Sequence, residues 1–164
     1  MSESKFDETT DKIVAIDLDE KSVVRRSVEV EHERKVAMYD LLDMNRFRPV
    51  GDFTGPFKVR LGIEDGKRLI FKIDDEDGTN LTNVSMPLSP FRRIVRDYFQ
   101  ICESYYDAIK KLSPSQIETI DMARRGLHNE GADVLVDALK DKIDIDKATS
   151  RRLFTLVCVL HIRG

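Results

Sequence analysis

The sequence predicts a single α+β domain, an antiparallel sheet of about four strands with a C-terminal helical half packed largely on one face. Two patterns predict this class. Between residues 12 and 88, apolar and polar residues alternate around short turns, as in strands with one buried face. From residue 89 onward the apolar residues recur at helical spacing. With 164 residues, the chain is long enough for one domain with its own core.

The first part of the chain predicts a tail, a strand and a helix. Residues 1–11 are polar except for Phe6, and we expect them to form a disordered tail. The next segment, Lys12–Asp19, has the alternation of a strand. A charged connection at residues 20–27 leads to a helix from about Val28 to Asn45, where the apolar period becomes helical. The domain is therefore expected to start at residue 12.

The strongest strand signal lies between residues 57 and 73, where apolar residues occupy alternate positions: Phe57, Val59, Leu61, Ile63, Leu69, Phe71 and Ile73. Asp65-Gly66 divides this region and favours a two-residue hairpin turn, because both residues must adopt positive φ. After a second turn at Asp77-Gly78, a weaker strand is expected over residues 81–88. Leu81 is out of phase with the later apolar residues of this strand, which predicts either a bulge or a shorter strand.

The helical half contains two similar helix starts, Leu88-Ser89-Pro90 and Leu112-Ser113-Pro114. Serine is a favoured N-cap and proline suits the first helical position. Ser113 is followed three residues later by Gln116, which completes a capping box. We expect the first helix to run to about Lys111 and the second to stop at Gly126, a residue type that often follows a helix end.

Two further helices are predicted, one over residues 132–140 and one over residues 147–161 that is capped by Asp146. A short extended segment at residues 143–145 separates them. The last helix is almost entirely apolar from Leu153 onward. A helix that is apolar all round belongs in a core, so we expect this one to be structural.

The best candidate for a functional site is the stretch Arg124–Gly131, with the sequence Arg-Arg-Gly-Leu-His-Asn-Glu-Gly. If its glycines bracket a turn, the polar residues between them lie near the start of the next helix. Free backbone N–H groups and arginines there could hold a carboxylate or phosphate. The predicted ligand-binding residues are Arg92, Arg124, Arg125, His128 and Asn129.

Catalysis and simple ion pairing are the alternatives for this stretch. Because histidine titrates near neutral pH, His128 and Glu130 are candidate catalytic residues acting as acid and base in a small enzyme, with arginines as anion clamps. Alternatively, Arg124 and Arg125 only form ion pairs with Asp121 or Glu130, and Asn129 caps a helix. The leading hypothesis is a non-catalytic binding or regulatory module that contacts an anionic ligand or a protein partner through the helical half.

Arginine pairs and net charge bear on the class of partner. Adjacent arginines occur at residues 25–26, 92–93, 124–125 and 151–152. Neighbours on a helix point about 100° apart, so we expect at most one of each pair to face a given site. Residues 1–87 carry 14 basic and 19 acidic residues, whereas residues 88–164 carry 13 and 11. The net charge of −3 argues against a general nucleic-acid binder, which needs a basic face.

The remaining chemical signals predict no metal, no cofactor and no membrane span. The Asp74–Gly78 run does not fit a calcium loop, because the first and twelfth positions would be Ile73 and Val84. Cys102 and Cys158 lie in apolar runs and are expected to be buried free thiols, which favours a reducing cytoplasm. The longest apolar run is far shorter than a bilayer span.

Five segments of the sequence together resemble an uncharacterised protein family of alphaproteobacteria: His32–Arg34, Pro90–Val95, Ile101–Tyr106, Arg124–Gly131 and Arg152–Leu160. The resemblance extends from about residue 12 to the end, and several long matching runs make it specific. It implies a bacterial cytoplasmic protein. Because the family has no assigned activity, the resemblance gives no residue a catalytic role.

Overall fold

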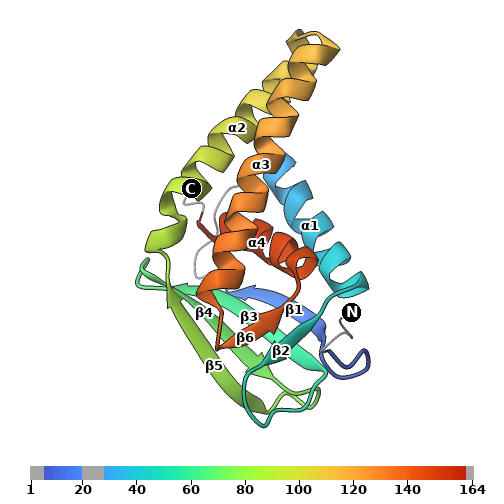
Figure 1. Cartoon of the computed structure of the whole chain (residues 1–164), viewed down its shortest axis with the longest axis vertical. Helices are drawn as coiled ribbons and strands as arrows, with labels where there is room; N and C mark the ends of the chain where they lie inside the picture. Colours follow the sequence, from blue (N-terminus) through green and yellow to red (C-terminus); the bar gives the residue numbers. More distant parts are fainter. Residues whose placement is uncertain (1–5, 20–27, 162–164) are drawn as a thin grey trace, which may run out of the picture.

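The computed structural model describes residues 6–19 and 28–161. The predicted connection at residues 20–27, with the arginine pair at 25–26, lies outside the described residues, as do residues 1–5 of the predicted tail. The α+β fold class is confirmed: a four-stranded sheet lies at one end of the molecule and a helical half covers it (Figure 1).

Residues 6–11, which precede the predicted start of the domain, make contacts with its body. Asp11 is buried, and its main-chain carbonyl accepts a hydrogen bond from the N–H of Phe47 at 3.0 Å. The guanidinium of Arg48 lies over the ring of Phe6 at 5.5 Å. Residues ahead of position 12 therefore also pack on the body of the domain.

The main sheet has the order β1-β3-β4-β5, with β1 at Ile13–Asp19, β3 at Phe57–Glu64, β4 at Arg68–Asp74 and β5 at Asn80–Pro87. Strands β3, β4 and β5 form the predicted antiparallel meander. Strand β1 instead lies parallel to β3, so the sheet is mixed and the prediction of a purely antiparallel sheet is wrong for this pair. The helix between β1 and β3 makes the crossover that a parallel pair requires.

Both local predictions for the meander are confirmed. Asp65 and Gly66 have φ values of 55° and 67°, as the hairpin turn requires. In the pairing of β4 with β5, Ile73 lies opposite Thr82, whereas the next residue lies opposite Asn80. Leu81 is thus left without a partner and forms the expected bulge.

A second, two-stranded sheet joins the two halves of the chain. Strand β2 (Phe47–Pro49) pairs antiparallel with β6 (Ile143–Ile145). The extended segment at residues 143–145 was expected, but β2 lies between the predicted helix and the strand signal that begins at Phe57, where no strand was predicted. Its pairing depends on a strand almost one hundred residues away, which no local pattern reveals.

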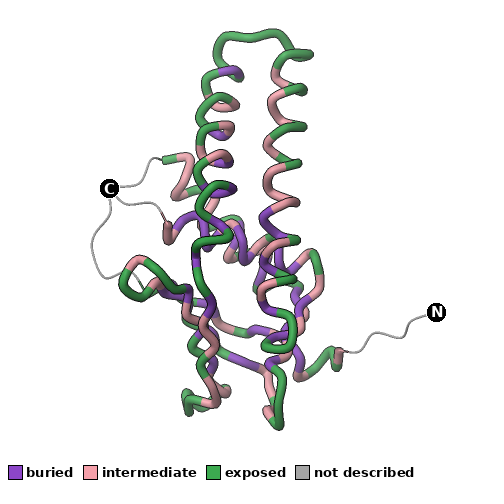
Figure 2. Tube along the Cα trace, turned by 60° about the vertical axis from the view of Figure 1, so that its left-hand side comes forward, coloured by how far each residue is buried: buried purple, intermediate pink, exposed green. Residues whose placement is uncertain are grey.

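In the described residues four α-helices lie on one side of the main sheet: α1 (Val28–Asp43), α2 (Arg92–Lys111), α3 (Pro114–Ala138) and α4 (Lys147–His161). Of these, α1 packs against β1 and α4 against β3. Helices α2 and α3 form an antiparallel hairpin that projects from the body, while α4 crosses between the other helices and the sheet (Figure 1). The hairpin tip is largely exposed (Figure 2). On the outer face of the sheet, Lys58 and Arg60 of β3 are exposed.

Only one of the two serine caps forms. Ser113 accepts a hydrogen bond from the N–H of Gln116, and the Gln116 side chain accepts one from the N–H of Ser113, so the capping box at the start of α3 is confirmed. The prediction of an N-cap at Ser89 is wrong. A 3₁₀ turn at Ser89–Phe91 precedes α2, and it has no side-chain cap. A backbone hydrogen bond closes this turn instead, donated by the N–H of Phe91 to the carbonyl of Leu88.

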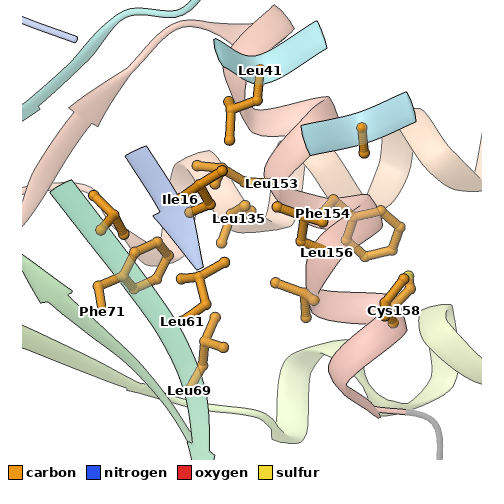
Figure 3. Close-up of a cluster of buried hydrophobic side chains, with 14 of the residues drawn as sticks. Ile16, Leu41, Leu61, Leu69, Phe71, Leu135, Leu153, Phe154, Leu156 and Cys158 are labelled. Atoms are coloured by element: carbon orange, nitrogen blue, oxygen red, sulfur yellow. The ribbon is translucent and has the colours of Figure 1, made fainter. Parts of the chain in front are cut away.

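Helix α4 forms the centre of the core, as its apolar sequence predicted. Leu153, Phe154 and Leu156 are fully buried. Figure 3 shows them between the apolar face of the sheet and the inner faces of α1 and α3. The cap at its start is also confirmed, because a carboxylate oxygen of Asp146 accepts a hydrogen bond of 2.9 Å from the N–H of Thr149.

Candidate functional site

The candidate stretch Arg124–Gly131 lies within one continuous helix. Helix α3 runs from Pro114 to Ala138, so the predicted stop at Gly126 and the predicted new start at Ala132 are wrong. Glycine in a helix interior costs about 1 kcal/mol relative to alanine. Packing against α2 and α4 outweighs that cost. The helix therefore offers no free N-terminal N–H groups at this point, and any binding must use side chains.

Gly131 is required by packing rather than by a turn. A Cβ atom built on Gly131 would lie 2.2 Å from the ring of Phe154 in α4. At Gly126, five residues earlier, an added Cβ would meet nothing within 4 Å. Gly131 thus lets α3 and α4 approach closely, whereas Gly126 has no such role.

The structure separates the predicted catalytic pair. Residues two apart on a helix point about 200° apart. The Nε2 of His128 lies 2.8 Å from the hydroxyl of Thr155 in α4. Glu130 faces α2 and accepts a hydrogen bond of 2.6 Å from Arg93. Arg92, a predicted ligand-binding residue, lies elsewhere, with its guanidinium 3.4 Å from the carbonyl oxygen of Gly66.

The other four predicted ligand-binding residues converge on one pocket. Its volume is about 540 Å³, and all four helices contribute to it. The lining residues are His32, Glu33, Val36, Ala37 and Asp40 from α1, Tyr98 from α2, Arg124, Arg125, His128 and Asn129 from α3, and Arg151, Arg152 and Thr155 from α4. The volume lies within the range typical of small-molecule sites.

Both members of two arginine pairs line this pocket, so the expectation that only one of each pair would do so is wrong. The pocket is broad enough to receive side chains that leave a helix about 100° apart. Arg151 donates a hydrogen bond of 2.9 Å from its Nε to the side-chain oxygen of Asn129. Arg152 donates to the carbonyl of Ala148 at 3.2 Å.

The arginines of α3 are bound to carboxylates. Arg124 pairs with Asp121 at 2.7 Å, and Arg125 pairs with Glu118 at 3.1 Å and with Asp121 at 3.2 Å. Both arginines thus form the ion pair with Asp121 that this alternative predicted, but Asn129 lies inside α3 and caps no helix there. Arg151 and Arg152 differ, because neither forms an ion pair with a carboxylate in the part of the chain that the structure describes.

Arg124 is held in place from several directions. Its guanidinium lies over the ring of Tyr105 at 4.5 Å, a cation–π geometry, and 3.7 Å from the carboxylate of Glu33. Tyr106 donates a hydrogen bond of 2.6 Å to the same carboxylate. Burial acts to lower the pKa of Arg124, but the hydrogen bond and charge of Asp121 contribute to a net increase. Arg124 is thus a fixed cation in the pocket wall.

His128 is a neutral side chain at physiological pH. Burial, followed by the positive charges of Arg124 and Arg151, lowers its pKa from 6.5 to about 4. Its ring also packs against Tyr98 and Phe154, with centroid distances of 5.5 Å to each. A neutral imidazole can donate or accept a hydrogen bond to a ligand without adding charge.

Two buried thiols lie outside the pocket lining. Cys102 and Cys158 are both free, as predicted. Burial raises the pKa of Cys102 to about 11 and that of Cys158 well above its usual value. Neither thiol is therefore ionised at neutral pH, and ionisation is what nucleophilic attack requires. Within residues 6–19 and 28–161, no group of three His, Cys, Asp or Glu side chains could hold a metal ion.

Sequence reasoning placed no residue of α1 or α4 in the site. His32 and Glu33 belong to a segment of the family resemblance but had no predicted role, and Arg151 and Arg152 were only one of several arginine pairs. Asp40 carried no signal, since it is one of many acidic residues. Which of these side chains meet depends on how α1 and α4 pack against α3, and no local pattern determines that packing.

Fold and pocket together define a single-domain α+β protein with a mixed four-stranded sheet and a charged pocket enclosed by four helices. Among the helices of the described residues, none combines the length and apolar character needed to cross a membrane. No solved structure matches the chain.

The chain belongs to the uncharacterised protein family UPF0262, whose family model matches residues 10–163. The UPF0262 protein of Paramagnetospirillum magneticum is 60% identical, over 93% of this chain and 97% of the relative. Those of Mesorhizobium japonicum and Sphingopyxis alaskensis are 55% and 52% identical, and each alignment covers at least 96% of both chains. The resemblance to an alphaproteobacterial family is thereby confirmed, and it assigns no activity.

Proposed function

We propose that this protein is a non-catalytic binding or regulatory module of the bacterial cytoplasm, and that the pocket between its four helices binds a small anionic ligand. The observation that carries the proposal is the pair Arg151 and Arg152. Both line the pocket, and neither forms an ion pair with a carboxylate among the described residues. An anion would supply the charge-assisted hydrogen bonds that these guanidiniums lack.

The surroundings of these arginines favour an anion further. Arg124 and Arg125 add positive charge from the neighbouring helix α3, and Asn129 orients Arg151 through its side-chain oxygen. Because guanidinium groups bind carboxylates and phosphates in a bidentate manner, two such groups in one pocket suit either ligand chemistry. The pocket's charged lining counts four arginines against Glu33 and Asp40.

The alternative of a small enzyme that uses His128 and Glu130 as acid and base draws no support from this geometry. The two side chains contact different helices, and Glu130 does not line the pocket. The neutral His128 is better suited to a hydrogen bond with a bound ligand than to taking up a proton at neutral pH.

Isothermal titration calorimetry with inorganic phosphate, pyrophosphate and citrate tests the proposal, at fixed ionic strength so that general salt effects cancel. We expect at least one of these anions to bind the native protein. In Arg151→Gln and Arg152→Gln, the Kd should increase about tenfold or more, the effect of one hydrogen bond to a charged group.

Arg92→Gln is the matched control. Arg92 is also an exposed arginine without a carboxylate partner in the described chain, but it lies outside the pocket. Its replacement should leave the Kd unchanged. The absence of binding by all three anions, or equal weakening by all three variants, would contradict the proposal.

A further inference from the structure

The pocket contains an unpaired carboxylate as well as unpaired guanidiniums. Asp40 of α1 lines the pocket, and within the described chain its carboxylate has no ion pair and no side-chain hydrogen bond. Glu33, the other acidic residue of the lining, differs because Tyr106 and Arg124 both contact it. Asp40 is therefore the acidic group of the pocket that remains available to a ligand.

The unpaired charges come from different walls. Asp40 projects from α1, whereas Arg151 and Arg152 project from α4. Helices α1 and α4 pack against each other, yet the carboxylate and the guanidiniums do not approach within the 4.0 Å of an ion pair. Opposite charges that share a pocket without meeting leave a gap that a third group can bridge.

A ligand with only negative charge uses only part of this arrangement. Its anionic group would gain from the arginines, but any part of it near α1 would face the like charge of Asp40, which costs free energy in a partly buried site. A positively charged group on the ligand would convert that repulsion into a charge-assisted hydrogen bond. Asp40 would then favour ligands that carry a cationic group, in addition to disfavouring ligands that place negative charge near α1.

Apolar side chains accompany Asp40 on α1. Val36 lies four residues before it, on the same face of the helix, and Ala37 adjoins Val36. Both line the pocket, together with the ring of Tyr98. This surface suits a short aliphatic segment between the charged ends of a ligand.

We infer that the ligand of this pocket is bipolar: a phosphate or carboxylate held by Arg151 and Arg152 is joined through a short aliphatic segment to a cationic amine that pairs with Asp40. This inference rests on the anion-binding function proposed above and narrows its ligand class.

Two pairs of isosteric probes test the inference by calorimetry. Phosphoethanolamine is compared with propyl phosphate, and 3-aminopropyl phosphate with butyl phosphate, so that the members of each pair differ in the amine but not in size. We expect at least one aminated probe to bind the native protein about tenfold more tightly than its alkyl isostere, the effect of one charge-assisted hydrogen bond. Two lengths are used so that the result does not depend on one spacing.

Variants then assign the preference to its residues. Asp40→Asn should abolish the difference within each pair while the alkyl phosphates bind as well as before or better. Arg151→Gln should weaken both members of a pair by the same factor. Asp43→Asn is the matched control, because Asp43 is an exposed carboxylate of the same helix that does not line the pocket.

The outcomes separate the two proposals. If alkyl phosphates bind but neither amine improves on its isostere, or if Asp40→Asn keeps the preference, the bipolar ligand is wrong and the anion site stands. If neither the phosphate esters nor the simple anions bind, the proposal of an anion site is wrong. The proposal of a bipolar ligand is then wrong as well, because it rests on that site.

Discussion

The two halves of helix α3 are held in different ways. Toward its C-terminus, Gly131, Ala132 and Leu135 are buried against the body of the molecule. Toward its N-terminus, residues 114–120 are exposed or half-buried, and among the described elements the helix packs there along α2 (Figure 2). Tertiary packing holds the C-terminal half of α3 in place. The capping box and the pairing with α2 hold the N-terminal half. The pocket lies where the two meet, so its side chains have an anchored backbone and an opening to solvent.

The largest expected effect on stability comes from a substitution in the buried, C-terminal half of α3. In Gly131→Ala, the new methyl group would lie 2.2 Å from the ring of Phe154, so α3 and α4 must move apart. We expect a loss of about 3 kcal/mol in the free energy of unfolding, at the upper end for an overpacked core. Urea denaturation measures it. An unchanged midpoint would show that the close approach of these helices contributes nothing.

The next effect concerns the boundary between the halves, where His128 packs. The unfolded chain takes up a proton at this residue near its ordinary pKa of 6.5, but the folded chain does so only near pH 4. Between these values the unfolded state binds more protons, so stability falls as the pH is lowered. At pH 5 the contribution is about 2 kcal/mol relative to pH 8.

Replacing the histidine should remove that loss. Denaturation of the native protein and of His128→Gln at pH 8 and pH 5 gives the comparison. His32→Gln serves as control, because His32 is an exposed histidine of the same pocket. Identical pH dependence in the native protein and in His128→Gln would refute the effect.

A smaller effect is expected at the projecting half. Ser113→Ala removes the capping box at the tip, which typically costs about 1 kcal/mol. Because the tip is held locally, hydrogen exchange should accelerate at Gln116 and Ile117 much more than in α4. Ser89→Ala is the control, since Ser89 begins a turn without a side-chain cap and its loss should not accelerate exchange. Equal acceleration throughout the protein would show that the two halves unfold together.

The smallest effect has the opposite sign. Gly126→Ala adds a methyl group where nothing lies within 4 Å, in the interior of a helix. We expect it to stabilise the protein by about 0.5–1 kcal/mol, because alanine loses less backbone entropy than glycine. Thermal denaturation of the native protein, Gly126→Ala and Gly131→Ala under the same conditions measures the two changes in stability. A destabilised Gly126→Ala protein would mean that this glycine also has a packing role.

Patterns carried by neighbouring residues predicted most of the fold. Alternation gave the meander, Asp65-Gly66 its turn, Leu81 its bulge, and the apolar run from Leu153 the core helix. The errors arose where contacts between distant segments determine the structure. Parallel pairing of β1 depends on the path of the whole crossover.

The candidate site shows the same division. Helix α3 contributed the expected Arg124, Arg125, His128 and Asn129, but its glycines were taken for a turn. Gly131 is explained by Phe154, which lies on a different helix. Asp40, Arg151 and Arg152 reach the pocket only through the packing of α1 and α4.

The central position of α4 affects how the chain can fold during synthesis. Every other described helix and strand precedes α4 in the chain, yet its side chains fill the space between the sheet and the other helices (Figure 3). A growing chain on the ribosome must therefore keep the apolar faces of those elements uncovered until α4 has emerged. Exposed apolar surface of this kind promotes aggregation and attracts chaperones. Completion of the core therefore awaits the synthesis of residues 147–161.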